Sequence, residues 1–182
     1  VLKAIEDGLI DSVDDPITKY LPEWNVLQVQ PLTIRHLASM NTGLFWDERS
    51  RSPFSLIAKL NFYDDLEYYT FTDLYAIGNP GDEQHYNSGG TQLLGTLLDR
   101  VLGEKSVATY MQEKFWTPLG CEFNAKWILD SEEHQNEKTY GGIVSTARDI
   151  ARLGLVINNN GFWNGQQILS RSDMELITTT PY

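Results

Sequence analysis

The sequence has 182 residues, of which 41% are hydrophobic and 21% charged, a composition that suits one domain with a buried core and argues against disorder. Its 14 Lys and Arg stand against 25 Asp and Glu, so a net charge of −11 makes binding to a phosphate backbone unfavourable. The single cysteine, Cys121, can neither close an internal disulfide nor hold a thiolate zinc site alone, and no apolar run approaches the roughly 20 residues that span a bilayer.

The two ends of the sequence lack the usual start and stop signals. Residues 1–8 place apolar side chains at positions 1, 2, 4 and 5 before Gly8, which is the pattern of the last turns of a helix whose N-cap is missing. The other end stops at residues 179–182 without a natural finish. We therefore expect residues 1–182 to be a single-domain piece of a longer protein.

The first third of the sequence predicts connections and two short helices. Two prolines without any hydrophobic period predict an extended surface connection over residues 11–24. Thr33 is expected to cap a short helix that Gly43 ends. Ser52, followed by a proline at the first helical position, is expected to cap the next helix. The apolar face of that helix is expected to hold Phe54, Ile57 and Leu60.

The strongest helical pattern runs from Gly89 to Leu102. It follows an aromatic-rich stretch, residues 61–80, where weak periodicity predicts short helical turns or loops. Gly103 is expected to end the helix. The apolar face of the helix consists of Leu93, Leu94, Leu97, Leu98, Val101 and Leu102.

The last part of the sequence predicts three more helices and a hairpin. Ser106 is expected to open one helix, Thr146 with Asp149 to form a capping box for a second, and Ser170 to start the last. Between these helices, residues 130–138 look like an exposed polar loop, and residues 163–166 carry a hairpin turn signal. The predicted class is therefore mainly α with a small β-hairpin.

Most common catalytic and binding motifs are absent from the sequence. Ser88 lies in Tyr-Asn-Ser-Gly-Gly, which lacks the first glycine of a Gly-x-Ser-x-Gly nucleophile elbow. The three histidines, His36, His85 and His134, are scattered and do not show metal-binding spacing. The glycines near residue 80 lack the Lys-Ser/Thr of a phosphate loop.

The turn that leads from residue 80 into the strongest helix is the one segment that remains a candidate for catalysis. Tyr86 there lies near the positive end of the helix dipole, which favours a phenolate, and a neighbouring Lys would favour it further. Ser88 is well placed to be the N-cap of the helix. The alternative is that Tyr86 is a buried aromatic side chain and Ser88 only a cap.

Residues 80–95 resemble the second motif of the serine β-lactamase and penicillin-binding-protein superfamily, which is Tyr-x-Asn or Tyr-x-Ser followed by a Leu-Leu-Gly helix. The resemblance is closest to the class C-like esterase and 6-aminohexanoate-dimer hydrolase branch. Four further segments match the family in its order, so that the likeness covers nearly the whole chain: residues 14–23, 32–44, 116–120 and 141–152.

Two motifs of that superfamily have no counterpart in the sequence. No Ser is followed by Lys three residues on, and Ser55 with Lys59 is spaced by four. The third motif, Lys-Thr-Gly or His-x-Gly, is expected after residue 182, since residues 138–140 read Lys-Thr-Tyr. The resemblance thus implies the helical middle of a β-lactamase/transpeptidase-like α plus β fold, without most of its central antiparallel sheet.

The resemblance also implies a chemistry. In such an enzyme a Ser attacks an ester, amide or lactam carbonyl, an acyl-enzyme forms, and water resolves it. Tyr86 would be the general acid/base, and Ser88 would hydrogen-bond the catalytic Lys or the substrate. The implied partners are a small-molecule substrate and no nucleic acid, membrane span, metal or organic cofactor. An exported or periplasmic location of bacterial type is favoured.

The isolated chain would lack its nucleophile and be inactive, and it could form homo-oligomers through the face that the missing sheet would cover. One alternative is a non-catalytic binding module derived from the same scaffold. Another is a complete hydrolase that uses Ser88 as nucleophile and His85 as base, which requires two side chains of unfavourable spacing to meet.

Overall fold

The computed structural model describes residues 1–24, 26, 30–49 and 52–179. Within these residues helices dominate, and the strands belong to two short antiparallel hairpins. The mainly α class is therefore confirmed.

The elements follow one another along the chain with short connections, apart from the longer loops around α2, before α5 and between β1 and β2. The α-helices are α1 (Leu2–Glu6), α2 (Ile34–Ala38), α3 (Leu56–Phe62), α4 (Leu66–Thr72), α5 (Ser88–Leu102), α6 (Val107–Met111), α7 (Ala147–Asn158) and α8 (Arg171–Thr179). A 3-10 turn, η1 (Ile17–Lys19), follows α1, and α6 continues into a π-helical turn, η2 (Gln112–Trp116). The strands are β1 (Lys126–Trp127), β2 (Ile143–Val144), β3 (Phe162–Trp163) and β4 (Gln166–Gln167).

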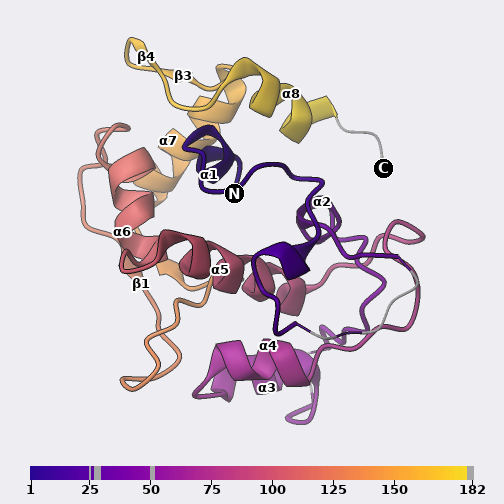
Figure 1. Cartoon of the computed structure of the whole chain (residues 1–182). Helices are drawn as coiled ribbons and strands as arrows, with labels where there is room; N and C mark the ends of the chain where they lie inside the picture. Colours follow the sequence, from indigo (N-terminus) through magenta and orange to yellow (C-terminus); the bar gives the residue numbers. More distant parts are fainter. Residues whose placement is uncertain (25, 27–29, 50–51, 180–182) are drawn as a thin grey trace.

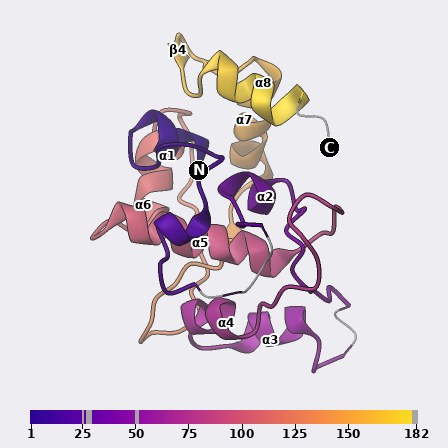
Figure 2. The same ribbon diagram turned by 45° about the vertical axis from the view of Figure 1, so that its right-hand side comes forward.

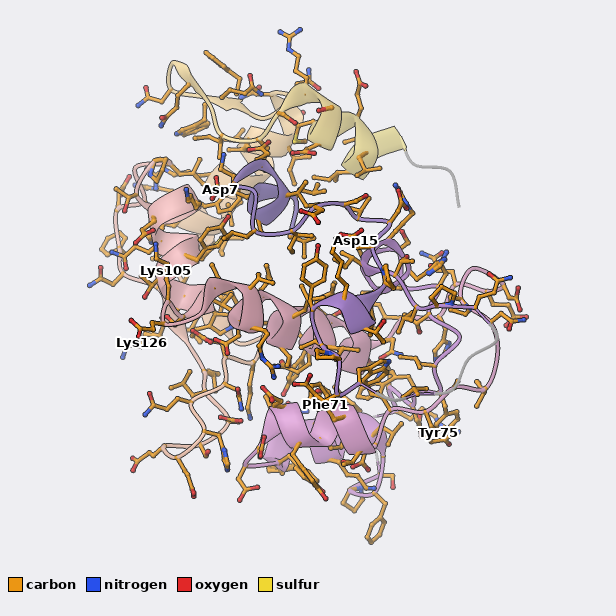
Figure 3. All side chains as sticks on the ribbon, viewed as in Figure 1. Asp7, Asp15, Phe71, Tyr75, Lys105 and Lys126 are labelled. Carbon is orange, nitrogen blue, oxygen red and sulfur yellow. The ribbon has the colours of Figure 1, made fainter. Side chains whose placement is uncertain are left out.

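Helix α5 runs through the middle of the molecule (Figure 1). Helices α2, α3, α4 and α6 all contact it. In Figure 1, α3 and α4 lie below α5, and α1, α7 and α8 lie above it, an order that Figure 2 preserves after rotation. Phe71 of α4 lies between α4 and α5 (Figure 3), where it also meets Trp24 edge to face at 6.2 Å between ring centroids.

The apolar face predicted for α5 forms the centre of the main core. Leu93 and Leu97 are fully buried, and the other four apolar residues of that face pack against the same core from partly buried positions. A second, smaller cluster of Leu119, Val156 and Ile168 joins α7 to the β3–β4 hairpin.

The predicted helix starts are confirmed at Thr33, Ser106 and Thr146. Each side chain accepts a hydrogen bond from a backbone N–H in the first turn of its helix. These caps satisfy N–H groups that have no partner within the helix.

The cap predicted at Ser52 is wrong, and so is the helix end predicted at Gly43. Ser55 caps α3 through the Ala58 N–H, which leaves Phe54 outside the helix and 83% exposed. Helix α2 already ends at Ala38, because the chain turns into a left-handed conformation at Met40, where φ is +57°.

The sequence predicts one of the two hairpins, β3–β4, but not the β1–β2 pair. In the predicted one, Phe162 pairs with Gln167, and both turn residues, Asn164 and Gly165, have positive φ, as the tight hairpin turn requires. The β1–β2 pair was not predicted, because its strands have two residues each and lie far apart in sequence. The intervening loop is also less exposed than predicted, since the Glu137 carboxylate is buried and accepts the Ala108 N–H at 3.0 Å.

Helix α7 buries only part of its apolar surface. Val156 is buried, whereas Ile150, Leu155 and Ile157 are each 42–45% exposed. Among the described residues, no helix is both long and apolar enough to cross a membrane.

His36 gives α2 a pH dependence that can be measured. Its Nδ1 accepts the Thr33 N–H at 3.2 Å, completing a capping box. Burial, aided by the Arg35 guanidinium, lowers the pKa of the His36 imidazole below its usual value. The folded chain therefore binds this proton more weakly than the unfolded chain, so His36 contributes stability that is present above the unfolded pKa of about 6.5 and is lost as the pH falls.

We predict that His36→Gln flattens this dependence, because Gln keeps an acceptor at the third helical position but does not titrate. Between pH 7 and pH 5, the urea midpoint of the wild-type chain should fall more steeply than that of the variant. Equal slopes for the two proteins would contradict the assignment.

Candidate active site

The motif of residues 86–88 lies at the N-terminal end of α5, where the loop after α2 meets the loop after α4. The His85 N–H donates to the Met40 carbonyl, and the Phe45 N–H donates to the Tyr75 carbonyl, both at 2.8 Å. The Phe45 and Tyr75 rings stack, with centroids 5.2 Å apart, and Figure 3 labels Tyr75 at this corner. The chain that leads into α5 is therefore tied to the preceding loop.

Asn87, not Ser88, caps α5. Its backbone is extended, and its Oδ1 accepts the Gly90 N–H at 2.8 Å. The prediction of Ser88 as N-cap is therefore wrong by one residue, and Ser88 is the first residue inside the helix. Asn87 is only 1% exposed, and its Nδ2 has no hydrogen-bond partner in the described part of the chain.

Tyr86 points outward just before the cap. It is 60% exposed, so the alternative that it is a buried aromatic side chain is wrong. Its place beside the first turn of the 15-residue helix α5 puts it near the positive end of the helix dipole. The hydroxyl forms no hydrogen bond within the described residues and is accessible from solvent.

Ser88 is held by a residue that the sequence analysis missed, Glu48. One carboxylate oxygen, Oε1, accepts the Ser88 N–H at 3.0 Å, the Trp46 indole N–H at 2.7 Å and the Ser88 hydroxyl. Ser88 is only 5% exposed, so this contact lies at the margin of the interior. No sequence signal points to Glu48, because it lies 40 residues before Ser88 in an irregular segment.

Close packing against α5 fixes the position of Trp46 and hence of Glu48. Trp46 is 4% exposed, and its ring lies directly against Gly89. A Cβ at Gly89 would lie 2.5 Å from Trp46 Cζ3 and 2.7 Å from Leu74 Cδ2, closer than real contacts allow. A glycine directly after Ser88 is therefore a requirement of this packing.

The structure does not bring Ser88 and His85 together as nucleophile and base. His85 Nε2 lies 3.1 Å from the Trp46 carbonyl, whereas the Ser88 hydroxyl donates to Glu48. A complete hydrolase that uses Ser88 as nucleophile and His85 as base would need a hydrogen bond between these two side chains. The structure does not form it.

Two segments come close to the motifs that the sequence lacks, Ser55 with Lys59 for Ser-x-x-Lys and residues 138–140 for Lys-Thr-Gly. Both have structural roles away from residues 86–88. Ser55 is the cap of α3, and the Lys59 ammonium lies 3.5 Å from an Asp73 carboxylate oxygen. Lys138 donates to the Asn61 carbonyl at 2.7 Å. Neither lysine is paired with the tyrosine of the candidate site.

A hollow of about 450 Å³ adjoins the motif at His85. Ligand pockets of small molecules are commonly of this size. It is lined by residues 43–46, 77–79 and 82–85. Its carboxylates belong to Asp82 and Glu83. Across the described ranges, no three His, Cys, Asp or Glu side chains are grouped to hold a metal ion.

Comparison with known proteins places these features in a family. The sequence model described as Beta-lactamase matches residues 1–181. The 6-aminohexanoate-dimer hydrolase of Paenarthrobacter ureafaciens is 26% identical over an alignment of 186 residues, gaps included, and the match covers 95% of this chain and 45% of that protein.

Solved structures show the same fold. The hydrolase EstCE1, which has promiscuous acyltransferase activity, has a TM-score of 0.76 at 18% identity, over 98% of this chain and 59% of its own. The octameric penicillin-binding protein homologue of Pyrococcus abyssi has a TM-score of 0.71 at 21% identity, over 96% and 44%. The chain thus spans about half the length of the proteins that it matches.

The packing at Gly89 can be tested directly. We predict that Gly89→Ala lowers the free energy of unfolding by about 1–3 kcal/mol, because the added methyl overpacks the contact with Trp46. The matched control is Gly154→Ala in α7, where nothing lies within 4 Å of the new Cβ and a gain of about 0.5–1 kcal/mol is expected. Equal changes in urea unfolding for the two variants would contradict the packing argument.

Proposed function

The chain belongs to the Beta-lactamase family, and from this premise we propose that it supplies one wall of the active site of a serine hydrolase. The enzyme would cleave an ester, amide or lactam through an acyl-enzyme. Within the family fold the chain is the helical region, with the central sheet largely outside it. We further propose that residues 1–182 form a single domain of a longer protein and are inactive alone.

The observation that supports this proposal best is the contrast between Tyr86 and Ser88. Tyr86 is exposed at the positive end of α5, and its hydroxyl forms no hydrogen bond with the residues that the structure describes, which suits a group that must exchange protons with a substrate. Ser88, two residues on, is buried and held in one position by Glu48. The motif therefore presents one accessible hydroxyl and one positioned hydroxyl, beside a hollow that begins at His85.

In the proposed reaction, a serine from outside this chain attacks the substrate carbonyl. Tyr86 takes part in transferring the serine proton to the leaving group, together with a lysine that also lies outside the chain. Water then attacks the acyl-enzyme and releases the acid. The carboxylates of Asp82 and Glu83 in the adjoining hollow favour a neutral or cationic substrate group there over an anionic one.

We predict that Tyr86→Phe, made in the full-length protein that contains this chain, lowers kcat/KM for an ester substrate by about 10²–10⁴-fold, because a general acid/base is lost. The melting temperature should not change, since the hydroxyl forms no hydrogen bond in the described structure. The matched control is Tyr68→Phe, a tyrosine on α4 that is 58% exposed. Unchanged kcat/KM for Tyr86→Phe would rule out the proposed role.

A further inference from the structure

We propose that Glu48 is a positioning residue for the active site, and that it makes Ser88 an obligatory hydrogen-bond acceptor. This inference rests on the proposed function of residues 86–88. It assigns a role to a residue outside the motif and narrows what Ser88 can recognise.

The Ser88 hydroxyl has a single proton to donate. A serine hydroxyl has one proton and two lone pairs, whereas an ionised carboxylate only accepts. The Ser88 hydroxyl donates its proton to Glu48 Oε1. Any second partner of the Ser88 oxygen must therefore bring its own proton, as an ammonium or an amide N–H does.

Further hydrogen bonds keep the Glu48 carboxylate in place. Its Oε1 also accepts the N–H of Ser88, one of the α5 groups that no intrahelical carbonyl can satisfy, and the indole N–H of Trp46. A carboxylate is further favoured at this end of α5 by the helix dipole. The Trp46 ring packs closely against Gly89. The Glu48 carboxylate is therefore oriented by two donors whose own positions are fixed, the Ser88 N–H and the Trp46 indole N–H.

The Glu48 contact determines which ligand groups Ser88 can bind. A Ser88 that only accepts will bind the N–H of an amide substrate, and it will not donate to a substrate carbonyl. Removing Glu48 frees the Ser88 proton, so the hydroxyl can turn and the preference is lost.

The test uses Glu48→Ala and Glu48→Gln in the full-length protein. Glu48→Ala should lower kcat/KM for an amide substrate by about 10²-fold, in line with the effect of misplacing a catalytic group. The fall should be smaller for the matching ester, which lacks the N–H. Glu48→Gln should restore most of the activity, because its amide oxygen still accepts the same three protons. Glu104→Ala, an exposed acid on the loop after α5, is the control and should have no effect.

Two results would overturn the inference. If Glu48→Gln is as inactive as Glu48→Ala, the negative charge matters and positioning by hydrogen bonds does not. If Glu48→Ala affects the amide and the ester equally, Ser88 does not select an N–H donor.

A second measurement on the 182-residue chain separates this inference from the proposed function. Urea midpoints are compared for Glu48→Ala, Ser88→Ala and the double variant. If the two side chains act as a pair, the double variant should unfold at nearly the midpoint of Glu48→Ala alone. Strictly additive shifts would overturn the pairing, whereas an inactive full-length protein with a coupled pair would overturn the proposed function only.

Discussion

The burial of α5 is the constraint on which the rest of the structure depends. This helix contacts α2, α3, α4 and α6, and its leucines form the centre of the core. Two glycines let other segments approach its backbone. Gly89 admits the ring of Trp46, and Gly95 admits the side chain of Thr139, since a Cβ there would lie 2.1 Å from Thr139 Oγ1. Other segments therefore pack closely against α5 both at its first turn and at its middle.

This constraint explains how neighbouring residues acquire different environments. The helix begins at a buried cap, Asn87, so the residue before the cap projects to solvent and the residue after it faces the interior. The proposed acid/base at Tyr86 and the proposed acceptor at Ser88 follow from this geometry. The same geometry leaves the Asn87 Nδ2 donor buried without a partner in the described structure, which is unusual for a polar group.

Local signals in the sequence predicted the elements that local physics determines. Thr33, Ser106 and Thr146 cap their helices through groups within three residues, and the Asn-Gly turn at 164–165 determines its hairpin. The two wrongly predicted caps are explained by packing, which local sequence does not reveal. Ser52 and Ser55 are both plausible caps by sequence, and so are Asn87 and Ser88. Which one acts depends on packing with other segments.

The long-range contacts could not be predicted from the sequence. Strands β1 and β2 have two residues each and pair across a long loop, and Glu48 reaches Ser88 from an irregular segment 40 residues away. The family resemblance pointed to Tyr86 and Ser88 but not to Glu48. The structure adds the partner because a carboxylate at the start of α5 satisfies donors that the helix leaves free.

The measurement that tests the central claim most directly is the intact mass of the 182-residue chain and of the full-length protein, each before and after incubation with a fluorophosphonate. We predict no adduct on the 182-residue chain, because Ser88 is buried against Glu48 and no serine of the chain is followed by a lysine three residues on. We expect one stoichiometric adduct on the full-length protein, at a serine outside residues 1–182. A stoichiometric adduct on the 182-residue chain that maps to Ser88 would show that the chain carries its own nucleophile.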